Sequence, residues 1–251
     1  MIAIRGAHIH SIKRGEAMIA HTVASYDEDL KSLDSKILRM GGLAEHQLTV
    51  ALSAIARADP EEAKQAVASD GAIDAMQREI EDLAVHIIAR RQPVAVDLRN
   101  VIGAMRIAGD LERVGDMSKN IGKRIVSFDE QAWLSPMTKS LGIMGDMALV
   151  QLKNVLDSYS QRDAELALKV WKRDEDIDWQ YNSLFRELLT YMMEDPRTIA
   201  YGAHLLFCAK NVERIGDHCT NIAEAVAYIV SGQSIADGRK KHEALPDDAA
   251  H

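Results

Sequence analysis

The sequence predicts an all-α fold in which a unit of three long helices occurs twice. Three observations predict it. Apolar residues recur every three or four positions, which is the spacing of one face of an α-helix. The five prolines fall between these periodic stretches, where a residue that breaks helices is tolerated. The pattern then recurs at a shift of 104 positions, so that Ile37 corresponds to Leu141.

The first unit is expected to form helices over residues 22–57, 60–91 and 97–127. Asp59-Pro60 is typical of a helix start, because an N-cap side chain precedes a proline in the first turn. Each helix has its own apolar stripe. The stripes are Ile37, Met40, Ala44, Leu48, Ala51 and Ile55; then Ile73, Met76, Ile80, Leu83 and Ile87; then Leu111, Val114, Ser118, Ile121 and Ile125.

The second unit is expected to form helices over residues 136–160, 163–194 and 196–231. Ser135-Pro136 indicates the first start by the same logic of an N-cap followed by proline. The stripe of this first helix repeats that of residues 37–55, and its members are Leu141, Met144, Ala148, Leu152, Val155 and Tyr159. Two further segments recur: residues 68–74 match 172–178, and residues 111–116 match 212–217.

The repeat divides the chain into four parts. Residues 1–20 form an N-terminal extension that matches neither unit, residues 21–130 form the first repeat and residues 131–231 the second. Residues 232–251 are rich in polar and small residues, so we expect a disordered tail.

Composition narrows the class of protein. Hydrophobic residues make up 47% and charged residues 27%, as in a folded soluble protein. The net charge of −8 argues against a nucleic-acid binder. Cys208 and Cys219 would lie roughly 16 Å apart on one helix, too far for a disulfide. No signal peptide or membrane-spanning run is evident, so we expect a cytoplasmic protein that meets membranes only through partners.

Four acidic pairs, each spaced by four residues, stand at equivalent places in the two repeats. They are Asp70/Asp74, Glu112/Asp116, Asp174/Asp178 and Glu213/Asp217. Two carboxylates one helical turn apart repel by roughly 0.2–0.5 kcal/mol, and a bound cation reverses the sign of that interaction. At 100° per residue, Glu112 and Asp116 fall on the outer face and Asp70 and Asp74 on the open side of their helix. If the two helices are neighbours, four carboxylates could converge in a surface groove.

Ordinary solvated charge is the alternative explanation for any single pair. Recurrence in both repeats favours a site for hard or borderline cations such as iron, manganese, magnesium or zinc, which accept oxygen ligands. Gly115 and Gly216 lie between the acids of their pairs, where they leave room for an ion or, equally, for a closely packed helix.

An enzyme is the competing class of function. A carboxylate-bridged ferroxidase uses Glu-x-x-His pairs that project into the core of a bundle. No glutamate in this chain has a histidine three residues later, and no phosphate-binding loop or nucleophile elbow is present. We therefore expect a protein that is not an enzyme.

The two Glu-Arg-(Val/Ile)-Gly-Asp stretches, at residues 112–116 and 213–217, are each followed after three residues by Asn-Ile, at 120–121 and 221–222. In this motif, and in His21-Thr22-Val23, Tyr26-Asp27 and Met40-Gly41, the chain resembles the PhoU family, the phosphate-uptake regulators of bacteria. The resemblance covers roughly residues 21–230. It implies two tandem three-helix bundles, commonly in a homodimer, and no catalytic activity.

The resemblance also implies partners and a cofactor. Family members work beside the phosphate ABC transporter, with its ATPase subunit, and a phosphate-sensing histidine kinase. They repress phosphate-starvation genes and restrain uptake when phosphate is plentiful. Their acidic motifs bind multinuclear clusters of iron, zinc, manganese or magnesium, and these motifs map onto the four acidic pairs. Because Gly71-Ala72 replaces Glu175-Asp176, the first site is expected to bind metal more weakly.

Overall fold

The computed structural model describes residues 3–127 and 137–235, with side-chain surroundings from residue 25 onward in the first range and from residue 138 in the second. The described part is helical and contains no strand. Its elements are α1 (Ala3–Arg57), α2 (Pro60–Ala68), α3 (Asp70–Arg91), α4 (Ala95–Val126), α6 (Met137–Gln161), α7 (Ala164–Lys172), α8 (Asp174–Glu194), the 3₁₀ turn η1 (Pro196–Thr198) and α9 (Ile199–Ser231).

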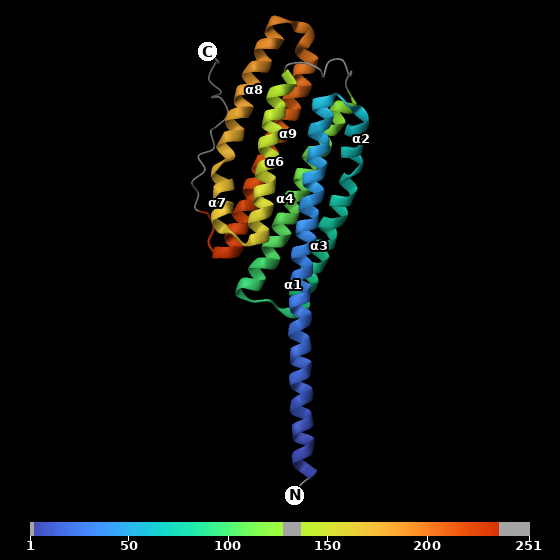
Figure 1. Cartoon of the computed structure of the whole chain (residues 1–251), viewed down its shortest axis with the longest axis vertical. Helices are drawn as coiled ribbons and strands as arrows, with labels where there is room; N and C mark the ends of the chain where they lie inside the picture. The colour runs from blue at the N-terminus through green and yellow to red at the C-terminus, as the bar shows by residue number, and fades with distance from the viewer. Residues whose placement is uncertain (1–2, 128–136, 236–251) are drawn as a thin grey trace, which may run out of the picture.

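These elements form the two predicted three-helix bundles, arranged side by side along one long axis (Figure 1). The first bundle packs α1, the α2–α3 pair and α4 together; the second packs α6, the α7–α8 pair and α9. The bundles meet mainly where α4 lies against α9, with α1 against α6 beside it. The predicted boundary between the repeats, at residues 130 and 131, lies outside the described residues.

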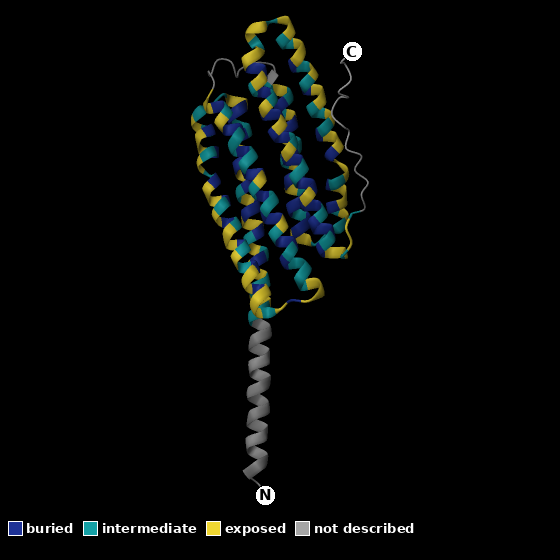
Figure 2. Ribbon diagram, turned by 180° about the vertical axis from the view of Figure 1, so that it is seen from behind, coloured by how far each residue is buried: buried dark blue, intermediate teal, exposed yellow. Residues whose placement is uncertain are grey.

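The predicted apolar stripes form the core. Every stripe residue of α1 and α6 is buried, from Ile37 to Ile55 and from Leu141 to Tyr159. Buried positions line the inner faces of the helices and exposed positions their outer faces (Figure 2). On α3 the stripe is buried except at Leu83, which is partly buried. The 3–4 spacing therefore located the core of each repeat correctly.

The helices differ from the prediction in two main respects. The first helix begins at Ala3 rather than near residue 22. The expected helices over 60–91 and 163–194 are each interrupted, at Ser69 and at Arg173, so that each becomes a short helix followed by a long one. The apolar spacing continues across both breaks, which is why the sequence pattern did not indicate them.

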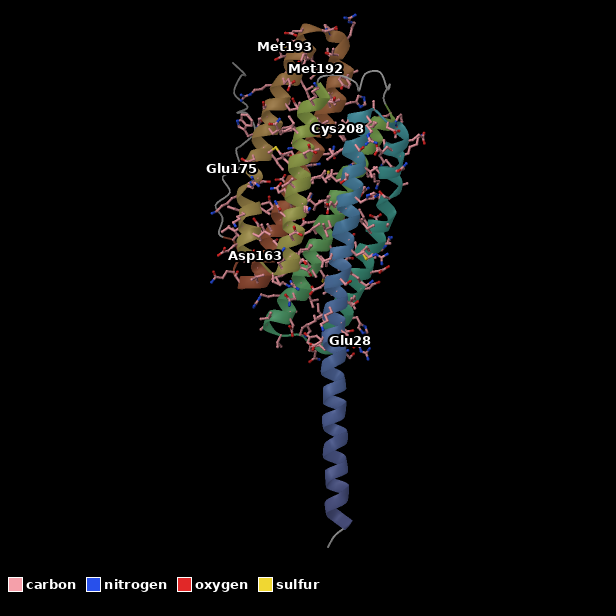
Figure 3. The ribbon with its side chains drawn as sticks, in the orientation of Figure 1. Glu28, Asp163, Glu175, Met192, Met193 and Cys208 are labelled. Carbon is pink, nitrogen blue, oxygen red and sulfur yellow. The ribbon has the colours of Figure 1, made fainter. Side chains whose placement is uncertain are left out.

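Helix starts are fixed by aspartate caps at equivalent places. Asp59 Oδ1 accepts hydrogen bonds from the backbone N–H groups of Glu61 and Glu62, at 2.9 and 3.1 Å. Asp163, labelled in Figure 3, caps α7 in the same way. The predicted start at Ser135-Pro136 and residues 236–251 of the predicted tail lie outside the described residues. Both cysteines are buried and free, as their spacing predicted. No helix in the described ranges is long and apolar enough to cross a bilayer.

Candidate functional site

The break in the second helix of each repeat places an aspartate at the first position of the helix that follows. Asp70 begins α3 and Asp174 begins α8, and both are buried, with 6% and 4% of their surface exposed. The prediction that Asp70 lies on the open side of its helix is therefore wrong. Asp70 lies one turn before Ile73 on α3, at the edge of the apolar stripe, and there it faces Lys119 of α4.

The first acidic cluster consists of Asp70 and Asp74 from α3 and Glu112 and Asp116 from α4. Burial raises the pKa of Glu112, and the charge of Asp116 raises it further; Arg113 opposes this, while Asp74 and Asp70 add to it. The charges of all three aspartates thus act on Glu112 across the contact between α3 and α4. Glu112 lies outside the core but is only 18% exposed.

An ammonium group already occupies this first cluster. Lys119 Nζ lies 2.6 Å from Asp70 Oδ2 and 3.2 Å from Asp116 Oδ1, so it bridges the two helices. The hydrogen bond to Asp70 is the main reason that the pKa of Lys119 is raised. Part of the repulsion among the carboxylates is therefore offset by a cation that belongs to the chain itself.

The second acidic cluster consists of Asp174 and Asp178 from α8 and Glu213 and Asp217 from α9. Its charge balance differs from that of the first. In the third helix of each repeat the shift is 101 positions, as in the match of residues 111–116 to 212–217, so Lys119 corresponds to Thr220. The hydroxyl of Thr220 donates a hydrogen bond of 3.0 Å to Asp174.

The cation of the second cluster comes instead from Lys210, whose Nζ lies 2.7 Å from Glu213 Oε1. Burial still raises the pKa of Glu213; the hydrogen bond and the charge of Lys210 lower it, and the charges of Asp217 and Asp178 raise it.

Glycine between the acids allows close packing of a helix. An added Cβ on Gly115 would lie 3.0 Å from Ile73 Cδ1 and 3.1 Å from Gln47 Oε1. Gly216 meets Ile177 and Gln151 in the same way. Of the two explanations left open for these glycines, the structure therefore supports the packing of neighbouring side chains against α4 and α9.

Two glutamines at equivalent positions, which the sequence pattern did not single out, hold the helix breaks. Gln47 Nε2 donates to the carbonyl oxygen of Ala66 at 2.8 Å, and Gln151 Nε2 donates to that of Val170 at 3.4 Å. Both side chains are buried, and neither Oε1 atom has a hydrogen-bond partner. A polar residue recurring 104 positions apart inside an apolar neighbourhood was the signal that could have revealed them.

A separate set of polar side chains, away from the two acidic clusters, connects the two repeats. His218 Nδ1 lies 2.9 Å from Asp110 Oδ1, and Asn221 donates to the same oxygen at 3.2 Å. The side chain of Asn221, the asparagine of the second Asn-Ile pair, is therefore directed across the α4–α9 interface.

The carboxylates of the two acidic clusters are the predicted ligands of metal ions. Within the described ranges, no three Asp, Glu, His or Cys side chains are close enough to hold one ion. The donors are nevertheless all oxygen atoms, and the carboxylates are near enough to shift the pKa of Glu112 and Glu213. This chemistry suits a hard cation once the side chains rotate toward it. The eight acids therefore stay a predicted metal site.

Comparison with known proteins identifies the repeated unit. The family model described as the PhoU domain matches residues 37–125 and again residues 141–226. A protein of Caulobacter vibrioides named "Phosphate-specific transport system accessory protein PhoU homolog" is 50% identical over 228 residues, covering 91% of this chain and 99% of that protein. A protein of the same name from Rhizobium meliloti is 47% identical over 224 residues, covering 89% and 94%.

The fold is similar to that of solved structures from the same family as these relatives. The crystal structure of PhoU from Pseudomonas aeruginosa superposes with a TM-score of 0.80 at 38% identity, covering 83% of this chain and 100% of that one. A phosphate transport system regulatory protein PhoU from Streptococcus pneumoniae gives a TM-score of 0.77 at 31% identity, covering 84% and 99%. Sequence motif, repeated domain and fold lead to one conclusion: the chain belongs to the PhoU family.

Proposed function

We propose that the protein is an accessory regulator of phosphate transport, which represses the phosphate-starvation response and restrains phosphate uptake when phosphate is plentiful. The observation that carries this proposal is the match to relatives named as phosphate-specific transport accessory proteins, at 50% identity over 228 residues and nearly their whole length. The protein acts in the cytoplasm, and it acts by binding rather than by catalysis.

Two partners follow from this role: the ATPase subunit of the phosphate ABC transporter and a phosphate-sensing histidine kinase. The protein couples the state of the first to the activity of the second, and reaches the membrane only through them. Helices of 20 to more than 30 residues, such as α4 and α9, offer long faces for such docking. We further propose a homodimer, and no nucleic-acid partner, in keeping with the net charge of −8.

The two acidic clusters are proposed to hold metal ions, iron, zinc, manganese or magnesium, in groups of one or more. Asp70, Asp74, Glu112 and Asp116 would hold the first group, and Asp174, Asp178, Glu213 and Asp217 the second. Bound cations would supply positive charge that relieves the repulsion among the carboxylates and ties α3 to α4 and α8 to α9. All-oxygen donor sets and the raised pKa of Glu112 and Glu213 support this proposal.

Deletion of the gene in cells grown with abundant phosphate tests the regulatory role. Loss of a repressor should switch on a phosphatase reporter that phosphate normally silences, and the wild-type gene should restore silence. A reporter that stays silent after deletion would contradict the proposed repression.

Metal analysis of the purified protein tests the clusters separately. We expect bound metal that falls when Glu112 and Asp116, or Glu213 and Asp217, are changed to alanine. Protein that binds no metal yet restores repression would exclude a regulatory role for the clusters and leave the adaptor role intact.

A further inference from the structure

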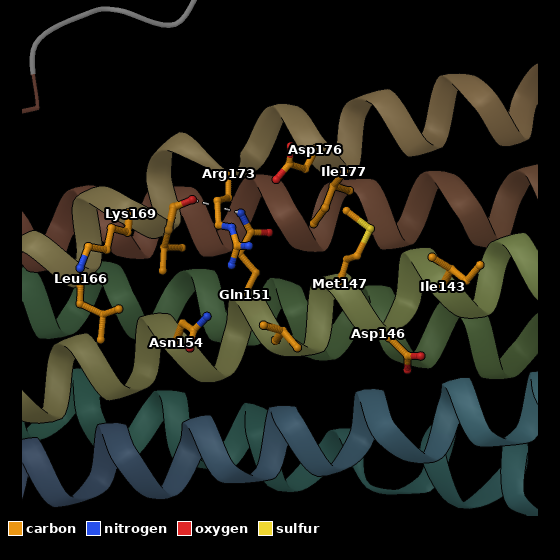
Figure 4. Close-up of a pocket in the computed structure, with 12 residues that line it drawn as sticks. Ile143, Asp146, Met147, Gln151, Asn154, Leu166, Lys169, Arg173, Asp176 and Ile177 are labelled. Atoms are coloured by element: carbon orange, nitrogen blue, oxygen red, sulfur yellow. Dashed lines mark hydrogen bonds between the residues drawn. The ribbon is translucent and has the colours of Figure 1, made fainter.

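A groove opens between α6 and the α7–α8 pair in the second repeat, and none of the eight acids lines it (Figure 4). Its volume is about 410 Å³, within the range of pockets that hold small organic ligands. The α7–α8 break at Arg173 lies along one wall, and α6 forms the other.

Half of the residues that line the groove are apolar. Two of these, Ile143 and Val150, lie about two turns apart on the same face of α6, and they are 56% and 53% exposed. Exposed β-branched residues in a concave surface are unfavourable in water and are typical of a site that a ligand covers. Leu166 and Ile177 face them from the opposite wall.

Two cations stand beside this apolar lining. Lys169 is in the last turn of α7 and Arg173 follows one turn later, so both lie on one side of the groove. Neither forms an ion pair with a described residue, although the chain as a whole is acidic. Asp146 and Asp176 also line the groove, and they disfavour a ligand with a second negative charge.

The first repeat provides an internal comparison. At a shift of 104 positions, Ile143 corresponds to Arg39 and Val150 to His46, while Lys169 corresponds to Gln65 and Arg173 to Ser69. A feature that the three-helix bundle needs for folding would be shared by both repeats. The apolar face and the two cations are present only in the second, so the bundle does not require them.

We propose that this groove binds a small amphipathic monoanion. An apolar body lies along the exposed face of α6, between the two walls, and a single carboxylate or sulfonate group is held by Lys169 and Arg173. The charged head gains charge-assisted hydrogen bonds from two donors that lack other partners. The apolar body of the ligand covers the side chains of Ile143 and Val150 and so shields them from water.

A pair of fluorescent probes with the same aromatic body tests the proposal on the full chain. 8-Anilinonaphthalene-1-sulfonate carries one sulfonate, and N-phenyl-1-naphthylamine carries none. We expect both to bind saturably at one site of the folded protein. The double substitution K169Q/R173S should weaken the sulfonate probe at least about tenfold, since hydrogen bonds to a charged group are lost. It should leave the neutral probe within about twofold.

The double substitution I143R/V150H should abolish binding of both probes. All four replacements are the first repeat's own residues at equivalent positions, so the fold tolerates them there. Thermal melting monitored by circular dichroism verifies that each variant is folded. Lys172→Gln, which removes an exposed cation of α7 that does not line the groove, is the matched control and should leave both affinities unchanged.

Three results would overturn the proposal. One is affinity for the sulfonate probe that is the same in K169Q/R173S as in the wild type. Another is non-saturating binding that both double variants retain. The third is the absence of probe binding together with photocrosslinking from position 150 to a protein, which would make the groove a docking site for a polypeptide.

Discussion

Lys119 and Thr220 occupy equivalent positions in the two repeats but bring different charges to the acidic clusters. Lys119 places an ammonium group between Asp70 and Asp116, whereas Thr220 donates a hydroxyl hydrogen to Asp174 without adding charge. The ammonium of Lys119 competes with a metal ion for the oxygen atoms of two carboxylates, whereas in the second cluster Lys210 engages Glu213 alone. The predicted weaker metal binding of the first cluster thus has a structural reason beyond the loss of two acids at Gly71-Ala72.

Replacing each of these two residues by the other should raise the metal affinity of the first cluster and lower that of the second. Lys119→Thr removes the competing ammonium, so we expect the protein to gain bound Mn²⁺ at the first cluster. Thr220→Lys adds one, so we expect metal to be lost from the second. Elemental analysis after equilibrium dialysis against Mn²⁺ measures both. Lys123→Thr, one turn further along α4 and exposed, is the control; the same metal content in all these proteins would contradict the idea.

The raised pKa of Glu112 predicts a pH-dependent effect on stability. Because the folded protein binds this proton more tightly than the unfolded chain does, stability falls as pH rises from the ordinary carboxyl pKa of 4.5 through the raised value. Glu112→Gln lacks this loss. In metal-free protein, its melting temperature relative to the wild type should therefore rise with pH above about 4.5.

The same variant checks the role of metal. Added Mn²⁺ at neutral pH should stabilise the wild type more than Glu112→Gln, because a charged ligand has been removed. A melting-temperature difference that does not change between pH 4 and 7 would show that the carboxyl of Glu112 titrates alike in the folded and unfolded chain.

At the scale of elements, the sequence was sufficient to predict those features that depend on residues of a single helix. The apolar stripes and the Asp59 cap follow from spacing and local hydrogen bonding, and both were predicted correctly. The break at Ser69 was missed, because it depends on Gln47, which reaches it from α1. The inward position of Asp70 was missed because this residue lies at the edge of the apolar stripe of α3, where the packing of α4 and its Lys119 decides whether it is buried. Contacts between helices are not encoded in the periodicity of either helix alone.

The glycines of α4 offer a test of how closely its neighbours pack. Gly109 has open space where a Cβ would be, so Gly109→Ala should stabilise the protein by about 1 kcal/mol through helix propensity. Gly115→Ala gains the same propensity but pushes against Ile73 and Gln47, and overpacking costs about 1–3 kcal/mol. We therefore expect no gain or a net loss. Urea unfolding measures both, and equal stabilisation by the two alanines would contradict the packing seen at Gly115.

At the scale of the whole molecule, the two repeats share an interface instead of standing apart. α4 and α9 pack along their lengths, and a Cβ on Gly103 would collide with the side chain of Ile229. Asp34 of α1 accepts hydrogen bonds from Tyr159 and Arg162 at the end of α6. His218 pairs with Asp110 across the α4–α9 contact. A substitution that destabilises one bundle should therefore also destabilise the other.

Ile80→Ala tests this coupling, because Ile80 is fully buried in α3 of the first repeat and its truncation should cost about 2–5 kcal/mol. The reporter is Trp171 in the second repeat, whose indole N–H donates to Glu224 at 2.9 Å. It is isolated by changing Trp133 and Trp179 to phenylalanine, and that double variant is the control. If the repeats unfold together, the urea midpoint from Trp171 fluorescence should fall as far as the midpoint from circular dichroism. An unchanged Trp171 midpoint beside a two-step dichroism curve would mean that the repeats unfold independently.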